Sequence, residues 1–138
     1  MESDGGKVEF TTLCSGSEGN CLYVQGGKTR ILVDIGCSAK KAQEALQKIA
    51  VAPESINAIL ITHEHSDHIK GIDVFARRFQ IPVYASPLTW QVLPFCDKLP
   101  CTLKQVFTYE LEIDDLGITF FKTSHDACQP VGMVMQAD

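Results

Sequence analysis

The chain has 138 residues, 45% of them apolar, which suffices for one compact domain with a hydrophobic core and excludes two. Its formal net charge of −5 argues against a broad basic face for duplex nucleic acid, although bound dications would offset carboxylates locally. No run approaches the roughly 18 apolar residues of a membrane span and no signal peptide is recognisable, so we expect a cytoplasmic protein. Six cysteines without a C-x-x-C pair are expected to be reduced thiols.

The order of the expected elements favours an α/β (α+β) domain with a mixed sheet. An antiparallel hairpin opens the chain, and short buried strands then alternate with amphipathic helices. The expected strands cover 8–13, 21–25, 30–33, 58–61, 80–85, 118–123 and 131–136, and the expected helices cover 39–50, 67–79 and a short stretch after Ser86-Pro87. Ser38 is the expected cap of the first helix, and Ser66 or Asp67 that of the second.

The loop over 14–20 is made almost entirely of small residues. Its glycines permit positive φ angles and leave backbone N–H groups available, so the loop could hold an anion or substrate through Ser15, Ser17 and Asn20. A plain hairpin connection explains the same residues equally well, because no helix follows directly.

Three histidines and a carboxylate follow the strand over 58–61 within six residues. His63 and His65 are two positions apart, so in extended backbone both imidazoles project to one side and can reach a single ion. Asp67 and His68 begin the next helix, whose positive end faces the cluster. Residue frequencies of a few per cent give H-x-H-x-D-H by accident in roughly one chain of this length in ten thousand. The pattern therefore predicts a metal site.

Two further residues lie at the ends of other strands. His125 follows the strand over 118–123 and is the natural third imidazole of the metal site. Asp34 closes the strand over 30–33, where it is either a turn residue or a second-shell carboxylate that accepts the N–H of a ligand histidine.

With these residues in place, the sequence resembles the metallo-β-lactamase-fold hydrolases, whose signature is H-x-H-x-D-H after a buried strand. The loops 14–21, 32–36 and 124–127 are similar to those of the YycJ/WalJ-type exonuclease-like subgroup. The resemblance implies an αββα sandwich. No histidine follows His125 and no bridging aspartate is recognisable, so residues 1–138 are expected to be the amino-terminal αβ half of a C-terminally incomplete domain.

The resemblance also implies a chemistry for the site. His63, His65 and His125 would hold one divalent ion with one open position, an arrangement that lowers the pKa of a bound water to about 7. Asp67 and His68 would begin a second site, and Asp67 would orient the metal-activated hydroxide as the catalytic residue. Zinc and manganese suit these ligands, and so does iron. Up to two ions are expected in the complete fold, but one in this chain, because the bridging ligand is missing.

Three functions remain open at this point. The first is a nuclease-like metallo-hydrolase, an exonuclease acting on phosphodiesters of DNA, whose activity in this chain is uncertain. The second keeps the fold but takes a thioester, lactone or β-lactam substrate. The third is a noncatalytic metal-binding half-domain that covers its missing half by forming a homo-oligomer. Cys14, Cys37 and Cys128 lie beside the expected site loops, so a thiolate could supply a missing ligand.

Overall fold

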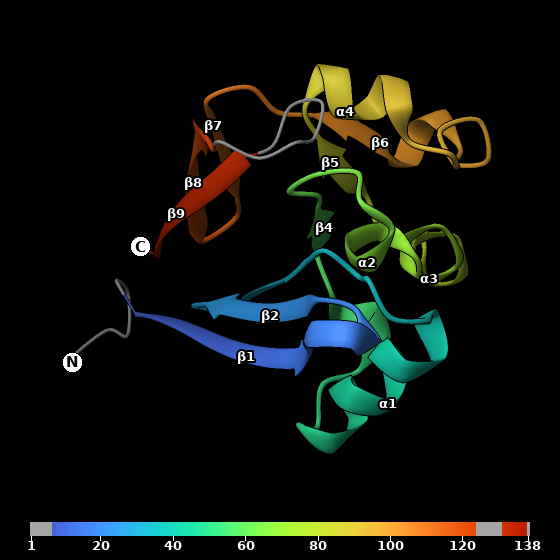
Figure 1. Ribbon diagram of the computed structural model, residues 1–138. Coiled ribbons are helices and arrows are strands. Elements are labelled where there is room, and N and C mark those ends of the chain that lie inside the picture. The colour runs from blue at the N-terminus through green and yellow to red at the C-terminus, as the bar shows by residue number, and fades with distance from the viewer. Residues whose placement is uncertain (1–6, 124–130, 138) are drawn as a thin grey trace.

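The computed structural model describes residues 7–123 and 131–137, which form two β-sheets and several helices (Figure 1). The larger sheet has the strand order β1-β2-β3-β4-β5-β6, and the smaller has the order β7-β8-β9. In the larger sheet β1, β2 and β3 pair antiparallel, whereas β3 to β6 pair parallel. The strands are β1 (Val8–Cys14), β2 (Cys21–Gly26), β3 (Thr29–Val33), β4 (Ala58–Leu60), β5 (Val83–Ala85), β6 (Lys104–Val106), β7 (Glu110–Ile113), β8 (Leu116–Lys122) and β9 (Val131–Ala137).

The helices follow strands of the larger sheet, as parallel pairing requires. They are α1 (Ala39–Lys48), α2 (Ser66–Ile69), α3 (Ile72–Phe79) and α4 (Pro87–Val92), with short 3₁₀ turns at Gly16–Glu18, Pro53–Ser55 and Cys101–Leu103. Ser38 caps α1 as expected, because its side chain accepts a hydrogen bond from the Lys41 N–H. Within 7–123 and 131–137, no helix is long and apolar enough to cross a membrane.

Each face of the larger sheet has its own hydrophobic core. Leu32 and Ile59 point to the face covered by α1 and α3, where Leu46 and Phe75 are fully buried. Their neighbours in β3 and β4 point the other way and pack on the smaller sheet; they include Ile31, Val33, Ala58 and Leu60. Figure 1 shows the helices α1 to α3 on one side of the larger sheet and β7 to β9 on the other. The expected mixed sheet is confirmed, and the smaller sheet adds a β layer beyond a single αβ half.

The single helix expected over 67–79 is wrong, because the chain forms two helices there with a break at Lys70–Gly71. The N-cap of α2 is His65, and neither Ser66 nor Asp67 occupies that position. Gly71 explains the break: its N–H donates to the Ile35 carbonyl at 2.8 Å, and a Cβ there would lie 2.3 Å from the carbonyl oxygen of Cys37. The loop after β3 therefore packs against the turn between the two helices.

Candidate metal centre

The site forms where three loops meet at the carboxyl ends of β3 and β4. Asn20, in the β1–β2 loop, donates its backbone N–H to the Asp67 carbonyl at 2.8 Å and accepts one from Gly36 at 2.8 Å. Ile35 donates its N–H to the His68 carbonyl at 3.0 Å. These bonds join the loops that follow β1, β3 and β4, so the histidine motif is held by backbone contacts from distant parts of the sequence.

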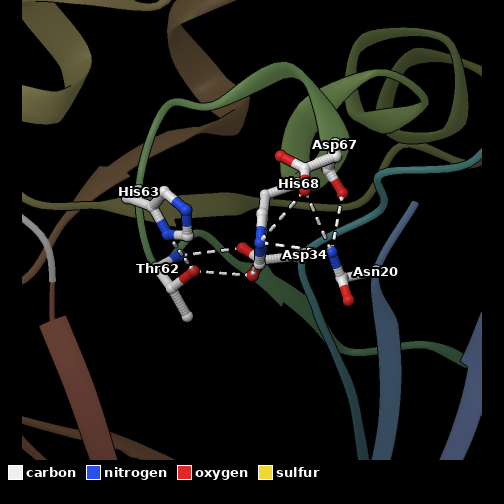
Figure 2. Close-up of polar contacts among 6 residues, drawn as sticks. All are labelled: Asn20, Asp34, Thr62, His63, Asp67 and His68. Carbon is white, nitrogen blue, oxygen red and sulfur yellow. Dashed lines mark hydrogen bonds and ion pairs between the residues drawn. The ribbon is translucent and has the colours of Figure 1, made fainter. Parts of the chain in front are cut away.

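Asp34 is the carboxylate on which the polar contacts of the site converge (Figure 2). The residue is 3% exposed, and its backbone adopts a left-handed φ of 63°, which an aspartate tolerates better than most residues. One carboxylate oxygen accepts the Thr62 N–H at 2.8 Å. The other lies 2.6 Å from the Thr62 hydroxyl and 2.7 Å from Nδ1 of His68. Asp34 thus ties the end of β3 to the loop after β4.

This network fixes the tautomers of two histidines. An ionised carboxylate only accepts hydrogen bonds, so His68 must donate Nδ1–H to Asp34 and the Thr62 hydroxyl must donate its single proton. The same hydroxyl lies 2.9 Å from Nδ1 of His63 and can therefore only accept, which places the His63 proton on Nδ1 as well. In the neutral rings of His63 and His68, the Nε2 lone pairs are then directed away from Asp34. That is the tautomer a histidine needs to bind a metal through Nε2.

The three imidazoles of the motif lie close together. The ring centroid of His63 is 4.7 Å from that of His65 and 4.0 Å from that of His68. The side chain of His63 is buried, whereas His65 and His68 are partly exposed. The expected convergence of histidines after the buried strand is thus present in the structure.

Asp67 and Asn20 form the exposed edge of the cluster. The Asn20 amide lies 3.3 Å from the Asp67 carbonyl oxygen, 3.4 Å from Oδ2 of Asp67 and 3.3 Å from Nε2 of His68. The Asp67 side chain is 56% exposed, with Oδ2 4.0 Å from Nε2 of His68. The hydrogen bond that His68 donates to Asp34 raises the pKa of His68 above its usual value; burial opposes the rise, and the charges of Asp34 and Asp67 add to it.

The residues predicted from the sequence are only partly brought together by the described structure. His63, His65, Asp67 and His68 share one cluster, and the Asp34 carboxylate contacts it through Nδ1 of His68. His125 and Cys128 lie outside the described residues. Among residues 7–123 and 131–137, no three histidine, cysteine or acidic side chains are arranged to hold an ion. The ligand set therefore stays a prediction.

The predicted anion loop has a different arrangement for each of its members. Ser15 and Ser17 are exposed; Ser15 is the N-cap of the 3₁₀ turn over Gly16–Glu18, and Ser17 lies within it. Asn20 instead directs its amide to Asp67 and His68. Whether the loop binds an anion remains a prediction.

Two residues of the site were not singled out in the sequence. The Thr62 hydroxyl connects Asp34 to His63 by hydrogen bonds. Its position in the sequence, between an apolar strand and the first histidine, could have indicated this role. Gly36 lies where the loops cross: a Cβ there would be 1.7 Å from the Asp67 carbonyl oxygen. Nothing in local sequence indicates that crossing.

The Thr62 hydroxyl is expected to matter more than its methyl group. Thr62→Val removes the link between Asp34 and His63 while keeping the shape, so we expect a loss of about 1–2 kcal/mol in the free energy of unfolding. Zinc affinity should fall roughly tenfold, because the ring orientation of His63 is released. Denaturant unfolding and equilibrium dialysis measure both. Thr62→Ser keeps the hydroxyl and is the matched control; equal losses in both variants would contradict the role of the hydroxyl.

Comparison with known proteins places this geometry in a family. The family model described as the metallo-beta-lactamase superfamily matches residues 15–127. The chain belongs to the metallo-β-lactamase superfamily. The fold expected from the sequence is thereby confirmed.

The relatives that match this chain include proteins whose names describe a nuclease activity. Exodeoxyribonuclease WalJ of Streptococcus pneumoniae serotype 2 (strain D39 / NCTC 7466) is 40% identical over 127 residues, covering 88% of this chain and 47% of WalJ. Exodeoxyribonuclease YycJ of Bacillus anthracis is 37% identical over 127 residues, covering 90% of this chain and 48% of YycJ. The predicted resemblance to the WalJ/YycJ subgroup is confirmed. The chain spans about half the length of these curated relatives.

Solved structures of metallo-β-lactamase-fold proteins superpose on nearly the whole chain. A B3 metallo-β-lactamase with an active-site glutamic acid has a TM-score of 0.75 at 22% identity, covering 97% of this chain and 56% of that chain. The metallo-β-lactamase-fold protein YhfI from Bacillus subtilis has a TM-score of 0.74 at 22% identity, covering 94% and 58%. At these identities the likeness shows the fold alone.

Proposed function

We propose that this chain is the amino-terminal part of a divalent-metal-dependent hydrolase that cleaves phosphodiester bonds of DNA as an exonuclease. The observation that carries the proposal is the 40% identity to exodeoxyribonuclease WalJ over 127 residues that include the whole histidine cluster. The family implies a divalent ion. Imidazole nitrogens and a carboxylate are a donor set that zinc, manganese and iron accept.

The residues proposed to hold the ion are those of the histidine motif and His125. His63 and His65, with His125 as third ligand, would hold the first ion, and Asp67 and His68 would begin a second site. When bound, such an ion supplies positive charge that stabilises the charge developing on phosphoryl oxygens. The Nδ1 contacts of His63 and His68 support this assignment, because both rings are already oriented by Asp34 and Thr62.

The choice of His125 as the proposed third ligand is supported by a contact of a described residue that follows it in the chain. Val131 begins β9, and its N–H donates to the Thr62 carbonyl at 3.1 Å. Val131 therefore contacts the loop that carries His63. His125 precedes Val131 by six residues, a span of about 20 Å when extended, so the chain length permits the proposed third ligand.

Asp67 has the exposure and the position for a role in proton transfer. Its carboxylate is the most exposed acidic group of the cluster, and the Asn20 amide orients it by a hydrogen bond at 3.4 Å. A carboxylate in this place can accept a proton from an attacking water molecule. We assign this positioning and proton-accepting role to Asp67.

The test is a nuclease assay on the purified chain, with 5′-labelled single-stranded DNA and a chromogenic β-lactam as parallel substrates. With manganese or zinc we expect release of short products from DNA ends and no β-lactam turnover. The double variant His63→Ala/His65→Ala should lose cleavage by at least about 100-fold. Asp97→Ala, an exposed carboxylate remote from the cluster in sequence, is the control.

Other outcomes of this assay would contradict the proposal. Turnover of the β-lactam without DNA cleavage would favour the second substrate class. Binding of metal with neither activity would favour a noncatalytic half-domain, and a sizing column would then show whether the chain forms a homo-oligomer.

A further inference from the structure

Three cysteines from separate segments lie close together, next to the backbone contact between Asn20 and Gly36. Cys14 ends β1, Cys21 begins β2, and Cys37 lies in the loop between β3 and α1. Cys14 and Cys21 face each other in the strand register, and Sγ of Cys14 lies 2.9 Å from Sγ of Cys37. All three are thiols rather than disulfides. We propose that Cys14 and Cys37 are an oxidation site, a thiol pair that a hydroperoxide converts into an intramolecular disulfide.

The sulfur contact is the main support for this pair. At 2.9 Å the two sulfur atoms are already in hydrogen-bonding contact, so they need only a small further approach to form a bond of about 2.05 Å. Cys37 and Cys21 are each 2% exposed, whereas Cys14 is only partly buried. A small oxidant therefore reaches Cys14 first, and Cys37 is the neighbour placed to complete the bond.

The hydrogen bonds among Cys14, Cys21 and Cys37 and a nearby positive charge favour a thiolate at Cys37. Hydrogen bonding from Cys21 lowers the pKa of Cys37 to about 6; burial opposes this, and hydrogen bonding from Cys14 and the charge of Lys41 lower it further. The pKa of Cys21 is raised, first by its hydrogen bond to Cys37 and then by burial. Cys21 thus remains protonated and stabilises the Cys37 thiolate, which is the nucleophilic form.

The reaction balances with a peroxide as the oxidant. Cys14 loses its proton to solvent, and the Cys14 thiolate attacks one oxygen of hydrogen peroxide; the O–O bond breaks, leaving a sulfenic acid on Cys14 and a hydroxide that solvent protonates to water. The Cys37 thiolate then attacks the Cys14 sulfur, forming the S–S bond and releasing hydroxide, which solvent protonates. The two sulfurs lose two electrons and the peroxide gains them.

The disulfide would cross-link the loops whose backbone contacts hold the histidine motif in place. Cys37 follows Gly36, whose N–H donates to the Asn20 carbonyl, and Cys21 follows Asn20. The new bond would join the end of β1 to the loop after β3, across this contact. The oxidation site does not depend on the proposed nuclease activity, because it rests on the thiol geometry alone.

The test is mass mapping of the purified full chain after treatment with hydrogen peroxide and alkylation of the remaining thiols. Cleavage after lysine, arginine and glutamate places the three cysteines on separate fragments, which are 10–18, 19–28 and 31–40. We expect fragments 10–18 and 31–40 to be cross-linked, with the loss of two hydrogen atoms and reversal by dithiothreitol.

Variants separate this pair from the other thiols. Cys14→Ser and Cys37→Ser should abolish the cross-link, whereas Cys101→Ser, which removes an exposed thiol elsewhere, should leave its rate within twofold of the unsubstituted chain. The cross-link mapped in the unsubstituted chain tests the proposal even if a variant misfolds. A cross-link through Cys21 or Cys101, sulfinic acid without a cross-link, or three unmodified thiols under conditions that oxidise Cys101 would each overturn the proposal.

Discussion

Gly36→Ala is expected to destabilise the fold by more than about 3 kcal/mol and to abolish metal binding. A Cβ at this position would lie 1.7 Å from the carbonyl oxygen and 2.3 Å from the carbonyl carbon of Asp67, and 2.6 Å from the backbone nitrogen of Asn20. All three are backbone atoms held by hydrogen bonds, so no side chain can rotate away to relieve the clash. The loops that carry Asp67 and Asn20 would have to separate.

The measurements are urea unfolding and zinc binding by equilibrium dialysis. Gly117→Ala is the matched control, because a Cβ there meets nothing closer than 3.7 Å and the residue lies in β8. Near-native stability of Gly36→Ala, or equal losses of stability in both variants, would show that Gly36 packs less closely against Asp67 and Asn20 than in the structure.

Asp34→Asn is expected to lower zinc affinity by about 10- to 100-fold. The substitution keeps the size of the side chain, and asparagine also tolerates the left-handed φ of 63°. It replaces an oxygen that accepts from both Thr62 and His68 by an amide that donates, so both partners must reverse or lose their hydrogen bonds. The His63 and His68 rings then lose the tautomer that directs Nε2 toward an ion.

Asp34→Ala is expected to be less stable than Asp34→Asn, with a loss of about 3 kcal/mol in the free energy of unfolding. It leaves the part-buried Thr62 N–H without its acceptor and places alanine at a left-handed φ. Chemical unfolding and metal titration of both variants check this order. Asp97→Ala is the control, since Asp97 is an exposed carboxylate and little change is expected there. If Asp34→Asn binds zinc as tightly as the unsubstituted chain, Asp34 does not set the tautomers.

The sequence predicted the parts of the structure that depend on local pattern. The glycine turn at 26–27 located the hairpin of β2 and β3, a short continuous apolar run located the buried strand β4, and the spacing of His63, His65 and His68 located the cluster. Period-two and period-3.6 patterns are properties of neighbouring residues, so they can be recognised without coordinates.

Features set by contacts between distant segments could not be predicted in this way. The break between α2 and α3 arises because Gly71 packs against the loop after β3, although the apolar spacing through Ile72 and Phe75 is that of one helix. Asp34 was open between a turn residue and a partner of histidine until its distance to His68 was known. The pairing of Cys14 with Cys37 likewise depends on the strand register and not on sequence spacing.

The most direct test of the central claim is a crystal structure of the chain grown with zinc or manganese, with the ion located by its anomalous scattering. We predict one well-occupied ion that is contacted by the imidazoles of His63, His65 and His125 together. An ion held elsewhere, or a His125 ring too distant to touch the ion that His63 and His65 share, would contradict the metal centre and the hydrolase built on it.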